Sequence, residues 1–196
     1  MDINQGKYRP IELLRYAGLF LWFCAGIPLF LMHLIVPEPL RLEDYVAWSM
    51  LHGLFGLMYW NLMQYLPERT SISSRLMYLS LLTGSALGIS VVTQSSLGGI
   101  LLLIVSVLLP WMLALVPAIA WLIVQNVLLA ILLSRIPEVS LNEVSTNAGF
   151  FLGISIFAFM SSVVVLRQNA ARDELRKVNS ELRATQSLLA ENTRIA

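Results

Sequence analysis

Two histidines, His33 and His52, are the side chains with the clearest capacity for chemistry in this sequence. Each lies toward the outer end of a long apolar run, so their rings are expected at similar depth. Such a pair could ligate a haem iron, with Met32 beside one of them. No carboxylate or cysteine accompanies them at ligand spacing, which favours histidines packed or hydrated at helix ends. A di-histidine haem membrane protein is therefore only a minor alternative.

Catalytic motifs are missing from the rest of the chain. No GxxxxGK[ST], GxSxG, HExxH or CxxC pattern occurs, and Cys24 is the single cysteine. No pair of acidic residues lies within an apolar run, which disfavours proton-coupled transport. We predict no catalytic, cofactor-binding or metal-binding residue in this chain. A small polytopic membrane transporter stays as an alternative function.

The composition indicates a membrane protein and disfavours a water-soluble enzyme. Hydrophobic residues make up 57% of the 196 residues and charged residues 13%, whereas soluble domains carry about a quarter charged residues. The 59 residues from Leu76 to Ser134 contain no Asp, Glu, Lys, Arg or His. Further apolar runs cover 17–36, 46–66 and 148–166. Spans of roughly 20 apolar residues that satisfy their own backbone hydrogen bonds predict an all-α polytopic helix bundle.

The long uncharged stretch must fold back on itself to fit a bilayer. A polar, glycine-bearing segment over 93–99 and the prolines Pro110 and Pro117 mark two breaks. The breaks predict short helices over 77–92, 97–109 and 117–133. Six transmembrane helices result, or five if the middle one is re-entrant.

The distribution of basic residues predicts the orientation. With six helices, eleven of the thirteen Lys and Arg residues lie on the side of both termini, and only Arg41 and Arg135 lie opposite. The positive-inside rule then places both ends in the cytoplasm. We expect a cytoplasmic segment over 1–16, a transmembrane sensor bundle over 17–166 and a cytoplasmic signalling helix over 167–196. The outer loops are short, the last one covering 134–147.

Small and polar residues inside the apolar runs predict helix contacts. Two GxxxG patterns allow close approach of helix backbones and involve Gly84, Gly88, Gly149 and Gly153. Four amides need partners inside the bundle, namely Asn61, Gln64, Gln125 and Asn126. Interhelical hydrogen bonding is the simplest role for these amides. A polar switch whose partners change between two bundle states is the sharper alternative.

After Leu166 the composition changes abruptly to a polar helix without Pro or Gly. Its apolar residues recur at a 3-4 spacing that polar residues interrupt, as in the a/d seam of a parallel two-stranded coiled coil. The seam comprises Leu175, Val178, Leu182, Thr185, Leu189 and Asn192. A solvated amphipathic helix that stays alone is the alternative.

The stretch LRKVNSELRATQSLLAENTRIA resembles the linker of bacterial sensor histidine kinases of the DesK/NarL type. The apolar stretches SSLGGILLLIVSVLLPWML and AWLIVQNVLLA are also similar to the membrane region of that family. In the family this helix leads into a phosphoacceptor motif, ELHD, and the chain ends just before the corresponding position. The phosphoacceptor and ATP-binding domains of the family are absent from these residues.

The resemblance implies a transmembrane input and signal-transmission module of a two-component sensor kinase. The expected location is the bacterial inner membrane, and the expected assembly is a homodimer. ATP and Mg would be cofactors of a kinase core that this chain lacks. A response regulator with a LuxR-type output domain would be the partner of that core, and no direct contact with nucleic acid is expected. Lipid order, bilayer thickness or a lipophilic compound would be the stimulus.

Overall fold

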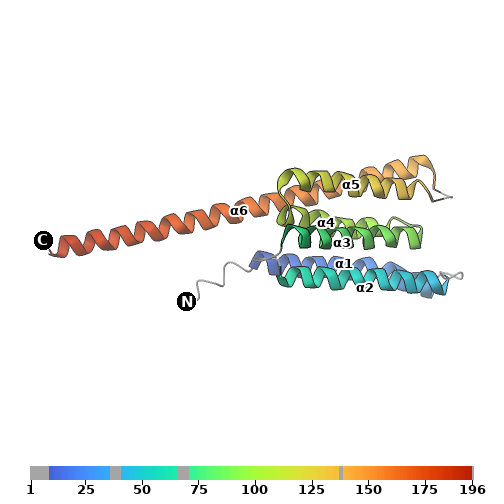
Figure 1. Ribbon diagram of the computed structural model, residues 1–196, viewed down its shortest axis with the longest axis horizontal. Coiled ribbons are helices and arrows are strands. Elements are labelled where there is room, and N and C mark those ends of the chain that lie inside the picture. Colours follow the sequence, from blue (N-terminus) through green and yellow to red (C-terminus); the bar gives the residue numbers. More distant parts are fainter. Residues whose placement is uncertain (1–8, 36–40, 66–70, 137–138, 196) are drawn as a thin grey trace.

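The computed structural model describes residues 9–35, 41–65, 71–136 and 139–195 (Figure 1). These residues form six helices, and no strand occurs among them. The helices are α1 (Arg9–Ile35), α2 (Leu42–Tyr65), α3 (Ile72–Thr93), α4 (Leu97–Met112), α5 (Leu115–Leu133) and α6 (Leu141–Ile195). The predicted all-α fold is confirmed. Within the described residues, α3, α5 and the part of α6 over Leu141–Leu188 are long and apolar enough to cross a membrane, and α4 is a shorter apolar helix.

Local signals explain where several helices begin and end. The Ser71 hydroxyl caps α3 by accepting from the Ser74 backbone N–H at 3.2 Å. The same helix ends at Gln94, whose φ of 46° places it in the left-handed region and stops the helix before α4. This turn lies within the predicted polar break over 93–99.

The loop before α6 is shorter than predicted. Ser140 and Glu143 form a capping box, in which the Ser140 backbone N–H donates to Glu143 Oε2 at 3.0 Å and the Glu143 N–H donates to Ser140 Oγ at 3.3 Å. This reciprocal pair starts α6 at Leu141, so the second half of the predicted 134–147 loop is helical. The capping signal was present in the sequence, but the low hydropathy of these residues concealed it.

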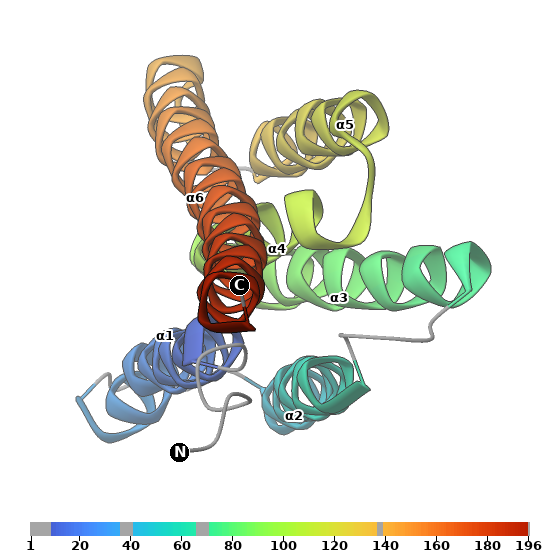
Figure 2. The same ribbon diagram turned by 90° about the vertical axis from the view of Figure 1, so that its left-hand side faces the viewer.

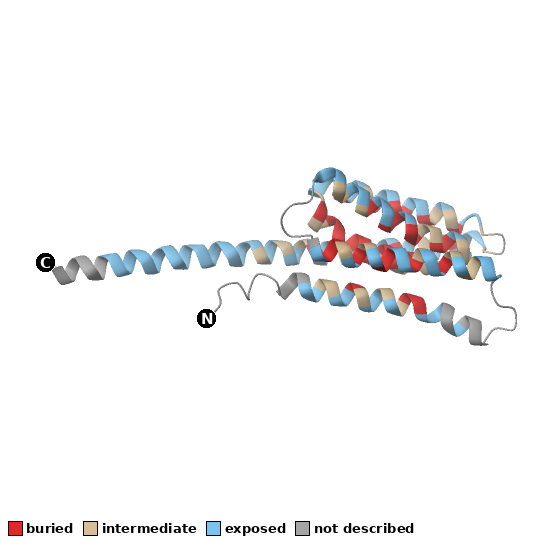
Figure 3. Ribbon diagram, turned by 60° about the horizontal axis from the view of Figure 1, so that its bottom comes forward, coloured by how far each residue is buried: buried red, intermediate tan, exposed pale blue. Residues whose placement is uncertain are grey.

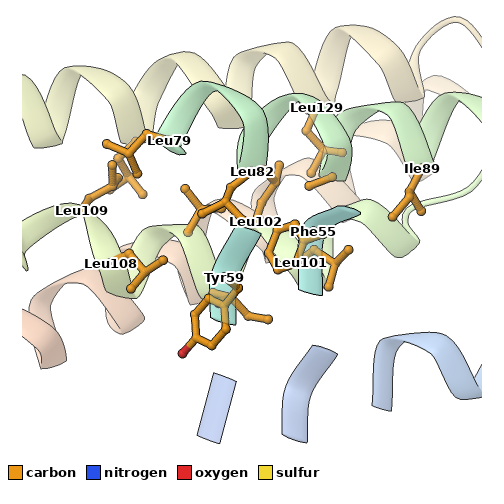
Figure 4. Close-up of a cluster of buried hydrophobic side chains, with 14 of the residues drawn as sticks. Phe55, Tyr59, Leu79, Leu82, Ile89, Leu101, Leu102, Leu108, Leu109 and Leu129 are labelled. Atoms are coloured by element: carbon orange, nitrogen blue, oxygen red, sulfur yellow. The ribbon is translucent and has the colours of Figure 1, made fainter. Parts of the chain in front are cut away.

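The shortest of the six helices, α4, is the centre of the bundle. It contacts α1, α3, α5 and α6, and Figure 2 shows it among the ends of α3, α5 and α6. Buried leucines of α4, including Leu102 and Leu109, lie in one hydrophobic cluster with Leu79 and Leu82 of α3 (Figure 4). Sixteen residues reach only about 24 Å along a helix axis. Because other helices surround α4, it does not itself have to match the thickness of a bilayer.

The longest helix, α6, leaves the bundle. Its first part packs on α4 and α5, and its second part extends as a single exposed rod (Figure 3). A helix of 55 residues is about 83 Å long. The start of α1 lies at the same end of the bundle as this rod (Figure 1). The prediction that the tail continues the last apolar helix without a break agrees with the structure.

Candidate functional site

A buried hydrogen bond joins α5 to α4 at the centre of the bundle. Gln125 is fully buried, and its Nε2 donates to Ser106 Oγ at 2.7 Å. Ser106 Oγ in turn donates to the Leu102 carbonyl one turn earlier in α4, at 2.8 Å. The amide predicted to need an interhelical partner therefore has one. Such a bond fixes the register between two otherwise apolar helices.

Three further polar contacts attach α6 to this centre. The Trp111 indole Nε1 donates to Ser162 Oγ at 2.8 Å, and Ser162 Oγ donates to the Val107 carbonyl at 2.7 Å. Ser155 Oγ lies 3.5 Å from Asn126 Oδ1 of α5. The α6 helix is thus tied to both α4 and α5 by its own serine hydroxyls. These contacts connect the bundle to the helix that leaves it.

The other two predicted amides do not join this cluster. Asn61 and Gln64 lie on α2, where Asn61 is half-buried and Gln64 is exposed. Helix α2 packs mainly on α3 and also contacts α1. The polar centre is therefore confined to α4, α5 and α6, with the neighbouring Trp121 indole donating to Thr83 Oγ1 of α3 at 3.1 Å.

The four predicted packing glycines have different surroundings within one chain. A Cβ on Gly88 would lie 3.0 Å from Leu51 Cδ1, so Gly88 is packed against α2. A Cβ on Gly84, Gly149 or Gly153 would meet nothing within 4 Å among the described residues. Their role as helix-packing positions stays a prediction, and for these three it needs a second chain or a bound molecule.

Closer packing occurs at glycines outside the GxxxG patterns. A Cβ on Gly98 would overlap the Ala86 carbonyl oxygen and the Ser90 hydroxyl, and one on Gly99 would lie 2.8 Å from the Phe151 ring. Gly98 lets α4 approach the backbone of α3 at the start of the central helix. The sequence contained this signal as a Gly-Gly pair, which we had interpreted only as a break.

The predicted seam lies on the exposed part of α6. Leu175, Val178 and Leu182 are 64%, 47% and 52% exposed, and Thr185 is also exposed. The side chains of Leu189 and Asn192 lie outside the described part of the chain. Upstream, α6 buries Phe151, Ser155, Phe159 and Ser162 against the bundle. At about 100° per residue, the seam falls on the side of α6 opposite to these buried residues.

His52 has the surroundings of a packed residue. Its ring stacks between Trp22 and Trp48, with centroid distances of 4.9 and 5.3 Å. Nε2 lies 3.0 Å from the point where a Cβ on Gly26 would stand, so the ring packs closely against α1. The side chain of His33 lies outside the described part of the chain. Among the described residues, no group of three or more His, Cys, Asp or Glu side chains is placed to hold a metal ion.

Sequence reasoning missed the partners of the polar centre. Ser106, Ser155 and Ser162 are the hydroxyls that receive or anchor the amide and indole groups. A serine inside an apolar helix can bond its own backbone four residues earlier, so these serines did not stand out. Their spacing in α6 offers a signal, because Ser155 and Ser162 are one heptad apart and lie on one helix face.

In comparisons with known proteins, no family model, no curated protein and no solved structure matches this chain.

Proposed function

We propose that this chain is the transmembrane input and signal-transmission module of a bacterial two-component sensor histidine kinase. In this proposal it is a multi-pass protein of the inner membrane, with all six helices in the bilayer and both ends in the cytoplasm. The observation that carries the proposal is α6, a single helix that is packed in the bundle at one end and exposed at the other. The resemblance of its tail to the linker of DesK/NarL-type kinases supports the same function.

In this proposal, the bundle has two packings of similar free energy, which differ in the polar contacts of α6. Ser155 and Ser162 hold α6 through only a few hydrogen bonds, and interhelical hydrogen bonds in membranes contribute about 0.6 kcal/mol on average. A cavity of about 440 Å³ lies beside α6, lined by Leu14 of α1, Val107 of α4 and Phe157 of α6, among others. A stimulus that favours one packing would shift or rotate α6 and so reach the cytoplasm.

The exposed seam supports a homodimer. A helix that stays alone leaves these three large apolar side chains in water, whereas two copies of the helix can bury them against each other. The ion pair of Arg176 with Asp173, at 3.7 Å, lies on the side of α6 opposite to the seam and leaves the seam apolar. A parallel pair of α6 helices would place two kinase cores side by side, where ATP and Mg would serve phosphoryl transfer to a response regulator with a LuxR-type output domain.

Cysteine cross-linking of the full chain in nanodiscs tests the dimer. In a Cys24→Ala background, Val178→Cys is expected to form an intermolecular disulfide efficiently under mild oxidation. Ser180→Cys is the matched control, since it is exposed but faces the opposite side of α6. Equal cross-linking at both positions, or none at Val178→Cys, would contradict a parallel seam.

A fusion tests the sensor function itself. The chain is joined in register to the phosphoacceptor and ATP-binding domains of a sensor kinase and reconstituted in phosphatidylcholine bilayers of different acyl length. Autophosphorylation is expected to change several-fold with bilayer thickness. Ala184→Pro breaks the exposed rod below the bundle and should abolish the response while leaving basal phosphorylation. A response that survives Ala184→Pro, or a rate that is the same in every bilayer, would refute the proposal.

A further inference from the structure

A second cavity, of about 580 Å³, lies between α3 and α5. Its lining includes Ser80, Thr83 and Gly84 of α3 and Pro117, Trp121 and Gln125 of α5. The volume falls within the range of small-molecule sites in proteins. Ser80 and Gly84 are exposed on the outer surface of the bundle, so the cavity opens sideways. In the proposed membrane orientation this opening faces the lipid.

Gly84 keeps the cavity open. A Cβ at this position would meet nothing within 4 Å, so the space beside α3 is not filled by another described helix. An apolar wall continues along α5 through Val124 and Leu128. The site is therefore shaped for a molecule with an apolar body that enters from the hydrocarbon phase.

One side-chain oxygen of a residue that lines the cavity has no partner among the described residues. Gln125 Oε1 is buried and accepts no hydrogen bond from the described residues. The amide nitrogen faces two acceptors of α4, since Gln125 Nε2 lies 2.7 Å from Ser106 Oγ and 3.4 Å from the Leu102 carbonyl. Oε1 is thus left as a free acceptor in an apolar setting. A buried acceptor without a donor is costly, so a bound group with an O–H or N–H would stabilise it.

We propose that this cavity binds a lipid-soluble molecule with an apolar body and one hydroxyl group, which donates to Gln125 Oε1. The apolar body lies along Gly84 and Val124, and the hydroxyl supplies the donor that Gln125 lacks. The next residue of α5, Asn126, lies 3.5 Å from Ser155 of α6. Occupation of the cavity can therefore reach α6 through two adjacent residues of α5. Binding does not depend on the proposed sensor function, but a role of the bound molecule as stimulus rests on it.

Photo-crosslinking of the full chain tests the site. The probe is a twelve-carbon alcohol with a diazirine near the far end of its chain, added to the protein in phosphatidylcholine nanodiscs. Its methyl ether is the matched probe that cannot donate. Mass spectrometry of peptides should place the alcohol on 80–87 and 117–128, with labelling by the ether about tenfold weaker, the loss expected for one hydrogen bond of about 1.4 kcal/mol.

Two variants locate the contact. Gly84→Leu fills the cavity and should abolish labelling of both segments, whereas Gly149→Leu adds the same side chain at an equally open site of α6 and should leave it unchanged. Gln125→Leu should reduce labelling by the alcohol to the level of the ether. If Gln125→Leu fails to fold, the comparison of alcohol and ether on the unmodified chain decides. Equal labelling by both probes, or labelling that survives Gly84→Leu, would overturn the site.

The outcome separates this site from the proposed function. The bilayer-thickness response of the kinase fusion needs no alcohol, so it survives if the alcohol does not bind. Specific labelling without any kinase response would leave the site standing and refute the sensor. If both hold, the alcohol should shift autophosphorylation of the fusion, and Gly84→Leu should remove that shift but not the response to thickness.

Discussion

Gln125 of α5 and Ser106 of α4 form a 2.7 Å hydrogen bond at the most buried level of the bundle. The bond joins the central helix to one of the three helices that are long and apolar enough to cross a membrane. Gln125 also lines the cavity between α3 and α5, and the next residue, Asn126, lies 3.5 Å from Ser155 of α6. The pair is therefore the best place to test how the bundle is held together.

A double-mutant cycle should reveal the coupling of this pair. Gln125→Leu alone leaves Ser106 without its donor, and Ser106→Ala alone leaves the Gln125 amide hydrogens without their best acceptor. Each single change should destabilise the bundle by about 1–3 kcal/mol, and the double variant should cost less than the sum by about 0.5–2 kcal/mol. Unfolding in mixed detergent micelles, followed by circular dichroism, measures the three differences. Additive losses would show that the two side chains do not interact.

The close approach at Gly98 predicts a sharp difference between glycines. Gly98→Ala would place a methyl group on the Ala86 carbonyl, so we expect a loss of about 1–3 kcal/mol of unfolding free energy from overpacking. Gly84→Ala is the control, because it sits in a helix with open space at its Cβ and should be neutral or slightly stabilising. The same micelle titration compares both variants. A tolerated Gly98→Ala would contradict the packing of α4 on α3.

Labelling of single cysteines tests the orientation in the membrane. In the Cys24→Ala background, Asn142→Cys at the start of α6 should react with a membrane-impermeant maleimide in intact bacterial spheroplasts. Arg172→Cys, on the rod of the same helix, should react only after the membrane is permeabilised. Both positions are exposed, so burial does not confuse the comparison. Reaction of Arg172→Cys in intact spheroplasts would reverse the proposed topology.

The polar residues of the seam predict an effect on switching. Thr185→Leu with Asn192→Leu makes the seam fully apolar and should lock the paired helices in one register. In the kinase fusion, we expect autophosphorylation to lose its dependence on bilayer thickness. Ser180→Leu adds one leucine on the opposite face and controls for general hydrophobicity. A normal response in the Thr185→Leu, Asn192→Leu variant would show that the seam is not the element that switches.

Much of the fold could be predicted because charge and hydropathy act over whole helices. The turn at Gln94 and the short link before Leu115 both fall at breaks predicted from glycine and proline. The start of α6 was wrong by seven residues, since the cap at Ser140 and Glu143 extends a helix through polar sequence. Hydropathy alone does not detect a cap.

The candidate site could be predicted only by residue type. The need of Gln125 for a partner followed from its charge-free surroundings, but the identity of that partner depends on how α4 and α5 are rotated against each other. Asn61 and Gln64 carry the same amide group but lie on α2, away from Gln125. Whether such an amide faces a neighbouring helix or the surface depends on how its helix is rotated about its own axis. The rotation of one helix relative to another is set by packing across the whole bundle, so it cannot be predicted from the hydrophobic periodicity of one helix.

Because α6 is one unbroken helix, a rotation of its packed part about the helix axis is carried along to its exposed part. Each residue of an α-helix advances the chain by about 100°, so one residue inserted between Arg172 and Leu175 would turn everything downstream by that amount relative to the bundle. Two added residues, a turn of about 200°, would present the wrong side of the rod to its neighbour, and seven would bring the original side nearly back. Output in such an insertion series would rise and fall with the phase of the helix instead of with its length.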